Sequence, residues 1–461
     1  MTTMSELSRR AFLKRLGYLT AAGVANPVTI NLMGMAEAAA QTATDYKALV
    51  CVFFDGGNDQ ANTLIPIDSK NYRTYKDVRQ SIAIDQSKVL PLIPSSSLAN
   101  GLKWGFHPNL ERLNSLFHLK KLAVLQNVGT LIQPTSLDEF NKKTVPLPNM
   151  LFSHSTQTKI WQSTSSAAFK EGWGGKIGDL ILNQNSQAMF SCVSTANNSL
   201  FLTGHKTVPL NIVSDGIIPI PSAQENARLY GSKECAQALK ELITSSRDNI
   251  MENHINEVTL RSIDAESTMS SALKSAGELK TQFSANNSLA EQLEVVAKLI
   301  KSRGHFGIKR QVFFVSLDGF DTHSSLLSRH GKQMSLVDDA LASFYEATEE
   351  LNMTDSVTTF TASDFGRTFS SNGDGSDHGW GSHHMIMGGA VNGRDFYGKS
   401  PEIGLNTAED TGQGRMLPTT SIDQYSATLA KWFGVPNSDL SLIAPNIRNF
   451  NNQDLGFMRS Q

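Results

Sequence analysis

The chain has 461 residues, of which 40% are hydrophobic and 18% charged, so it is long enough to bury a sizeable core. Its net charge is −2 and its pI is near 6.6, and nothing in the sequence resembles the basic clustering that nucleic-acid binding requires. The sequence has no apolar run of the roughly 18 residues that a membrane span needs, and its three cysteines are too widely spaced for a cysteine metal site.

The first 40 residues carry a targeting pattern. The stretch SRRAFLKRLGYLTAAGVANPVTI contains the pair Arg9 and Arg10, and small residues follow near Ala38 and Ala40. Paired arginines, a weakly apolar stretch and small residues are typical of a twin-arginine export signal. A basic amphipathic helix explains the arginines but not the whole pattern. We expect residues 1–40 to direct export through the twin-arginine translocase, which makes the mature protein periplasmic or extracellular.

Five apolar runs in the remaining chain predict strands. They lack alternation and end in turn residues, as expected for strands buried on both faces of a parallel sheet. Helical segments lie between them, so the pattern predicts an α/β fold with a mostly parallel central sheet flanked by helices. The runs are Tyr46–Asp59, Lys120–Thr130, Gln311–His323, Ser356–Thr368 and His384–Val391.

The segment from about residue 222 to 303 differs from the rest. It is polar, rich in Ala, Glu, Lys, Leu and Ser, and its apolar residues have helical spacing. We expect it to form a helical insertion within one α/β domain that covers residues 45–461.

Acidic and imidazole side chains follow the predicted strands, where open α/β sheets bind their ligands. Asp55 precedes two glycines that let the backbone turn sharply. Its carboxylate would either bind a cation or cap the helix that follows the turn. The motif SLDGFDTH holds Asp318, Asp321 and His323. Carboxylate with imidazole suits Zn²⁺ or Mn²⁺, and the alternative is an Asp-Gly turn with a capping Asp.

The motif SDFGRT adds Asp364 and Arg367 after the fourth predicted strand. An arginine in this position either binds a phosphate, sulfate or carboxylate group, or neutralises Asp364 in a structural ion pair. Both roles are compatible with the sequence.

The loop GSDHGWGSHH contains Asp377, His378, His383 and His384. Its alternate glycines would let it fold back over a site. Adjacent side chains at the start of a strand point to opposite faces, so we expect His383 to point inward as a ligand and His384 to support the structure. Asp377 would orient a histidine ligand.

The segment FSHSTQTKIWQ places Ser153, His154 and Ser155 at a predicted helix start. Backbone N–H groups at a helix start stabilise anions, and a metal ion can activate a hydroxyl there. Either serine is therefore a candidate nucleophile, while simple N-capping is the common alternative. His154 would bind substrate or metal, or support the site.

Taken together, the motifs FFDGGND, FHPNL, FSHS, LDGFDTH, SDFGRT, DHGWG and GGAVNG resemble the DUF1501 family of exported bacterial proteins, from about Ala48 to the C-terminus. This family is related to the alkaline phosphatase and sulfatase superfamily. The resemblance implies an alkaline phosphatase-like fold with one or two divalent ions, of which Zn²⁺ is expected first and Mn²⁺ or Ca²⁺ are alternatives.

By this resemblance, Asp55 and Asp364 bind one ion. Superfamily members have a histidine directly after the second of these acids, but this chain has Phe365 there. The site would then need an imidazole from His378 in the loop.

The resemblance assigns the other ion to Asp318 or Asp321, with His323 and His383. It places the nucleophile near Ser153 or Ser155. The chain has no Cys-x-Pro-x-Arg motif, so a formylglycine-dependent sulfatase is not expected.

We therefore expect an exported metal-dependent hydrolase of phosphate or sulfate esters, in which Arg367 and the ions stabilise charge on the transferring group. Its substrate would be a small ester or a glycan. The alternative is a non-catalytic exported surface or carbohydrate-binding protein that retains the fold and a structural metal site.

Overall fold

The computed structural model describes residues 45–165, 169–196, 199–212, 220–224 and 226–459. The expected export signal, residues 1–40, lies outside the described residues. None of the helices in the described ranges has the length and apolar character that a membrane crossing requires.

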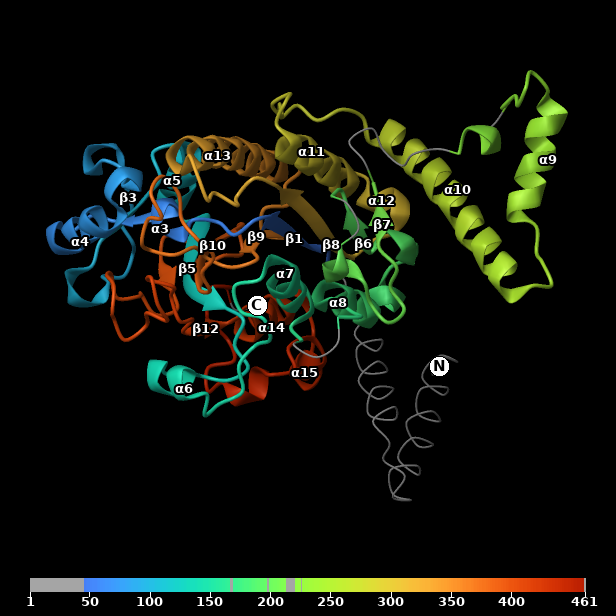
Figure 1. The fold of residues 1–461 in the computed structure, drawn as a ribbon. Helices are drawn as coiled ribbons and strands as arrows, with labels where there is room; N and C mark the ends of the chain where they lie inside the picture. The colour runs from blue at the N-terminus through green and yellow to red at the C-terminus, as the bar shows by residue number, and fades with distance from the viewer. Residues whose placement is uncertain (1–44, 166–168, 197–198, 213–219, 225, 460–461) are drawn as a thin grey trace, which may run out of the picture.

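A nine-stranded sheet forms the centre of the protein (Figure 1). Strand β1 (Lys47–Phe54) pairs in parallel with β8 (Arg310–Leu317) on one side and with β9 (Val357–Ser363) on the other. Every residue of β1 and β9 is buried, as expected for strands covered on both faces.

The outer strands extend this parallel centre. β10 (Ser382–Met387) is antiparallel to β9 and to β5 (Leu122–Gly129). The other pairs in this sheet are parallel, so the predicted α/β fold with a mostly parallel sheet is confirmed. Each of the five predicted runs overlaps a strand. The remaining strands are β6 (Cys192–Ser194), β7 (Leu210–Asn211), β11 (Phe396–Tyr397) and β12 (Thr420–Ser421).

Helices cover both faces of the sheet (Figure 1). Alternate residues of β1 supply two separate hydrophobic cores: Val50 and Val52 pack with the helices of one face, and Leu49 and Cys51 with those of the other. The first face carries α5 (Glu111–His118), α11 (Ser288–Lys301) and α13 (Leu326–Glu350), and the second carries α7 (His154–Ser163), α8 (Trp173–Ile181), α14 (Ile422–Phe433) and α15 (Leu440–Ile443).

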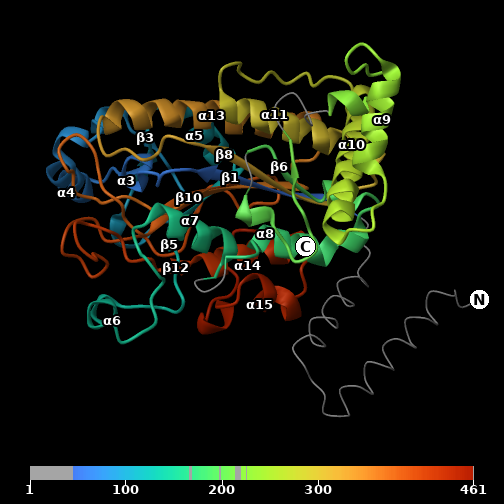
Figure 2. The ribbon, with the colours of Figure 1, turned by 45° about the vertical axis from the view of Figure 1, so that its right-hand side comes forward.

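The segment expected as a helical insertion has two parts. Helices α9 (Lys233–Thr244) and α10 (Ile250–Ala276) lie side by side (Figure 2) and extend away from the sheet (Figure 1). Helix α11 instead lies on the sheet, because eight of its residues are buried in the core. The short α12 (Arg303–Phe306) then leads into β8.

A smaller sheet lies at the other end of the molecule. It has the order β2 (Leu64–Pro66), β4 (Trp104–Phe106) and β3 (Leu90–Pro91). The other α-helices in the described residues are α3 (Gln60–Thr63), α4 (Ser69–Arg79) and α6 (Leu137–Lys142).

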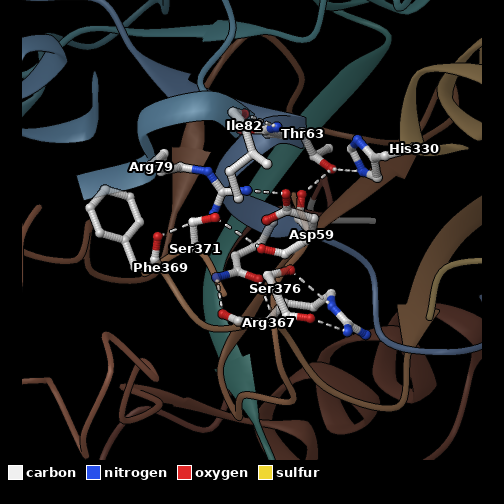
Figure 3. Close-up of polar contacts among 12 residues, drawn as sticks. Asp59, Thr63, Arg79, Ile82, His330, Arg367, Phe369, Ser371 and Ser376 are labelled. Atoms are coloured by element: carbon white, nitrogen blue, oxygen red, sulfur yellow. Dashed lines mark hydrogen bonds and ion pairs between the residues drawn. The ribbon is translucent and has the colours of Figure 1, made fainter. Parts of the chain in front are cut away.

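A buried ion pair fixes the chain that follows β1 (Figure 3). The guanidinium of Arg79 contacts the carboxylate of Asp59, and both side chains have an exposed fraction of 0%. Arg79 also donates to the carbonyl of Phe369 at 3.4 Å. On the other side of Asp59, Nε2 of His330 lies 3.0 Å from Oδ1 of Asn58. The turn is thus tied to α4, α13 and the loop after β9.

Replacing Arg79 with methionine should lower the free energy of unfolding by about 3–5 kcal/mol, because Asp59 would be left as an unpaired buried charge. Urea denaturation measures this loss. The double variant Asp59→Asn/Arg79→Met should recover part of it. Arg73→Met, an exposed change on the same helix, is the control and should stay within about 0.5 kcal/mol. Equal losses for Arg79→Met and Arg73→Met would contradict this role.

Candidate metal centre at the strand ends

Three carboxylates lie at the carboxyl ends of the central strands. β1, β8 and β9 end in register, so the residues that follow them, Asp55, Asp318 and Asp364, lie at the same edge of the sheet. Burial, followed by the charges of Asp364 and Asp318, raises the pKa of Asp55 to about 6. This edge therefore concentrates negative charge.

A glycine lets the loop after β8 approach β1 closely. Gly56 has a φ of +113°, and a Cβ at this position would lie 2.4 Å from the backbone nitrogen of Asp321. The N–H of Gly56 faces the carboxylate of Asp364, with a nitrogen–oxygen distance of 3.3 Å. This approach brings Asp321 beside Asp55, Asp318 and Asp364, which we call the row of acids.

Three histidines surround one oxygen of Asp321. Nε2 of His323 lies 3.1 Å from Oδ1 of Asp321, and Nε2 of His154 and of His378 each lie 3.5 Å from it. These residues come from the start of α7, the loop after β8 and the loop between β9 and β10. The fold thus brings together side chains from three segments that are distant in sequence, and we call these four residues the candidate centre.

The opposite nitrogen of each of these histidines is held by an oxygen. Because carboxylate and carbonyl oxygens accept hydrogen bonds, each Nδ1 carries a hydrogen, and in the neutral ring each Nε2 then directs a lone pair inward. Metal-binding histidines are held in this way by a second partner. The pairs are His154 with Asp364 at 2.6 Å, His323 with Asp377 at 3.0 Å and His378 with the carbonyl of Phe152 at 2.7 Å.

The pKa shifts of the candidate centre have identifiable causes. Burial lowers the pKa of His378. Burial also acts to lower the pKa of His154, but the hydrogen bond and charge of Asp364, with Asp321, raise it above its ordinary value. For Asp321, burial is opposed by Arg367, which holds the pKa below its usual range. At neutral pH, Asp321 is therefore ionised and His378 is neutral, as metal ligands must be, whereas the raised pKa of His154 opposes the neutral form that a metal ligand needs.

The inward atoms fit a divalent ion. Nε2 of His154 is buried and has no hydrogen-bond partner among the described residues. Nε2 of His323 lies only 2.9 Å from Nε2 of His378, so two lone pairs face each other unless a cation or proton lies between them. Ligands of a tetrahedral zinc ion lie about 3.3 Å apart, and His154, Asp321 and His378 offer ligand atoms within 4.8 Å of one another. These residues could hold Zn²⁺.

Arg367 has a different place from the one expected. Its exposed fraction is 0%, and its guanidinium donates to Oδ1 of Asp321 at 2.8 Å, to the carbonyl of Gly56 at 3.0 Å and to the hydroxyl of Ser376 at 3.0 Å. It cannot contact a transferring group from this buried position. Its contacts instead orient Asp321.

Phe365 packs against the candidate centre. Its ring centre lies 4.6 Å from that of His154 and 4.9 Å from that of His378. His378 faces Asp321, whereas Asp364 bonds to His154. The structure therefore does not pair His378 with Asp55 and Asp364 as the resemblance required, and Asp364 supports a histidine.

His383 and His384 lie outside the candidate centre. β10 is buried on both faces, so the two adjacent side chains enter opposite cores. Nδ1 of His383 accepts a hydrogen bond from the N–H of Asn127, and its ring packs on Trp104. The ring of His384 stacks on Tyr425. Burial lowers the pKa of both histidines to about 3. The structure places the expected inward ligand, His383, in a core.

The two candidate nucleophiles lie at the start of α7. Ser153 is the N-cap residue, yet its side chain makes no capping hydrogen bond. Ser155 is exposed. Within the described ranges, neither hydroxyl has a hydrogen-bond partner. Ser153 lies directly between Phe152, whose carbonyl binds His378, and His154.

Two contributions to the candidate centre had no clear sequence signal. His154 was expected in any of three roles, and the structure directs its Nε2 inward. Phe152 contributes through its carbonyl, and its φ of +69° is rare for a bulky residue. A contact made by a backbone carbonyl does not depend on the residue type, so it cannot be predicted from the sequence.

Replacing Asp55 with asparagine should stabilise the metal-free protein above pH 6. The pKa of Asp55 is raised in the folded state, so the ionised carboxylate lowers the free energy of unfolding. This loss of stability is absent below about pH 4 and complete above the folded pKa of about 6. After allowance for solvent screening, we expect a gain of about 1–2 kcal/mol at pH 8 and little change at pH 4. Thermal unfolding with a chelator tests this, with exposed Asp264→Asn as the control. A gain independent of pH would contradict it.

Several solved structures are distantly similar to this chain. PsFucS1 sulfatase from Pseudoalteromonas sp. is 9% identical, with 95% of this chain and 78% of that chain covered and a TM-score of 0.35. The soluble domain of lipooligosaccharide phosphoethanolamine transferase A from Neisseria meningitidis is 9% identical, with coverages of 87% and 94% and a TM-score of 0.32. The C-terminal periplasmic domain of EcEptC from Escherichia coli, in complex with Zn, is 11% identical, with coverages of 76% and 74% and a TM-score of 0.30.

Likenesses at this level assign neither an activity nor a ligand to this chain. The curated proteins include no match to it. A family model, by contrast, matches residues 46–431, which is most of the chain. The chain therefore belongs to the family described as "Protein of unknown function (DUF1501)".

Proposed function

We propose that this protein is an exported metal-dependent hydrolase of phosphate or sulfate esters. One observation carries the proposal: three Nε2 atoms converge on Oδ1 of Asp321 while oxygens hold the opposite nitrogens. The four side chains are between 25% and 46% exposed. Catalytic metal sites keep such an open face, whereas structural sites are closed.

His154, Asp321 and His378 would hold the ion, with His323 beside them. A divalent ion there would supply Lewis-acid charge to the oxygens of the ester. The nitrogen-rich ligand set favours Zn²⁺ over Mn²⁺ or Ca²⁺. One ion is favoured over two. A second ion would bind at the row of acids, but Nδ1 of His154, the nitrogen on that side, donates its hydrogen to Asp364 and has no lone pair for a metal.

Other residues would hold the ligands in place. Asp364 fixes the ring of His154, and buried Arg367 fixes Asp321. Ser153 is the better candidate for the nucleophile. Its hydroxyl is not used as a cap, and the first N–H groups of α7 stabilise negative charge next to it.

The zinc-loaded protein should hydrolyse members of a panel of aryl phosphates, phosphodiesters and aryl sulfates. His154→Ala and Asp321→Ala should each lower kcat/KM by at least about 1000-fold, because each removes a ligand. Ser153→Ala should have a similar effect and Ser155→Ala little effect. His254→Ala, on the projecting helix α10, is the matched control.

Metal content measured on the same preparations separates the alternatives. Bound zinc without turnover on any ester would contradict the hydrolase and favour a non-catalytic protein with a structural metal. Full activity in Asp321→Ala would contradict the candidate centre itself.

The arginine pair near the N-terminus supports export through the twin-arginine translocase. Arg9→Lys/Arg10→Lys should therefore leave the full-length chain in the cytoplasm of a bacterial host that has this translocase. Cell fractionation and immunoblotting measure the distribution, and Lys14→Gln is the control. Unchanged export of the double variant would contradict this route.

A further inference from the structure

A large polar pocket lies beside the candidate centre. Its volume is about 1000 Å³, which is at the upper end of the range for small-molecule sites. Asp55 and Asp318 line it at the strand ends, and Arg329 and Lys332 line it from α13. Thr158 lines it from α7, one turn after His154. Asp55, Asp318 and α7 therefore line the pocket on the side where the candidate centre lies.

The two cations of this pocket are not neutralised. Arg329 and Lys332 are three residues apart on α13, so they lie on the same face of the helix. Both are exposed. Within the part of the chain that the structure describes, neither side chain forms an ion pair or a hydrogen bond. An unpaired arginine next to a lysine in a pocket suits an anionic group of a ligand, because guanidinium matches carboxylate, sulfate and phosphate oxygens.

The neutral lining of the pocket has a different chemistry. Thr158, Asn286 and Ser288 contribute hydroxyl and amide groups, and none of these side chains has a hydrogen-bond partner among the described residues. Hydroxyls and amides both donate and accept hydrogen bonds. They match the hydroxyls of a polyol, which also do both. Phe314 and Leu336 add apolar surface for its carbon atoms.

We propose that the substrate is an ester of a sugar-like polyol that carries a second anionic group, and that Arg329 and Lys332 bind this second anion. The inference rests on the proposed function, because it assigns the ester itself to the candidate centre. The carboxylates of Asp55 and Asp318 repel an anion from the strand-end side of the pocket. The second anion is therefore directed to the two cations on α13.

Calorimetric titration of the zinc-loaded protein tests this inference without requiring turnover. The probes are a disaccharide with one sulfate ester and one uronate carboxylate, and a sulfated disaccharide without the carboxylate. Arg329→Gln/Lys332→Gln should raise the Kd of the uronate probe at least about tenfold. It should leave the Kd of the second probe nearly unchanged. Arg73→Gln/Lys76→Gln, an exposed pair with the same spacing on α4, is the matched control.

Three outcomes would overturn the inference: no binding of the uronate probe, an unchanged Kd in the Arg329/Lys332 variant, or an equal loss in the control variant. Failure of the proposed function has a different signature. Absent hydrolysis with the expected loss of binding would contradict only the hydrolase. Hydrolysis with binding that does not depend on Arg329 and Lys332 would contradict only this inference.

Discussion

The candidate centre depends on the ion pair between Arg367 and Asp321. Arg367 is buried after β9, and its donor nitrogen lies 2.8 Å from the same Oδ1 atom that the three histidines face. Asp321 is part-exposed in a loop and would otherwise be free to rotate towards water. The cation also keeps Asp321 ionised. The oxygen that the inward nitrogens surround is therefore fixed and charged before any ion arrives.

This ion pair in turn depends on buried polar contacts around it. The backbone N–H of Arg367 donates to Gln60, and the amide of Gln60 donates to the carbonyl of Arg367 at 2.8 Å. Gln60 follows Asp59, which is held by Arg79. The turn after β1 and the loop after β9 thus form one hydrogen-bonded unit. Hydrogen bonds between buried polar groups rigidify a structure, and these lie directly behind the candidate centre. Oδ1 of Asp59 and Nε of Arg79 have no hydrogen-bond partner among the described residues.

The fold was predictable from the sequence because parallel strands buried on both faces are continuous apolar runs. The apolar runs in Tyr46–Asp59 and Ser356–Thr368 each predicted a strand, and each run also contains the acid that follows its strand. Strand ends in one register then placed Asp55, Asp318 and Asp364 together. These conclusions need only the residue type and the period of the pattern.

Side-chain direction was not predictable in the same way. His383 and His384 were expected at the start of a strand, with His383 as a ligand, but both faces of this strand are buried in cores. His378 does turn inward, because Arg415 donates to its carbonyl at 2.7 Å and Phe152 accepts from its ring. Both contacts come from segments far away in the chain. The burial of Arg367 could not be predicted from the sequence, because it depends on how the loops around this residue pack.

The same contacts decide which cation satisfies the candidate centre. With each Nδ1 donating to an oxygen, a proton placed on His323 or His378 would relieve only the 2.9 Å contact between their Nε2 atoms. It would leave the buried Nε2 of His154 without a partner. A divalent ion can bind several inward atoms at once. Because the outer hydrogen bonds already hold these atoms, its binding costs little reorganisation. The proposed metal ion would therefore satisfy more of these inward atoms than one proton on His323 or His378 would.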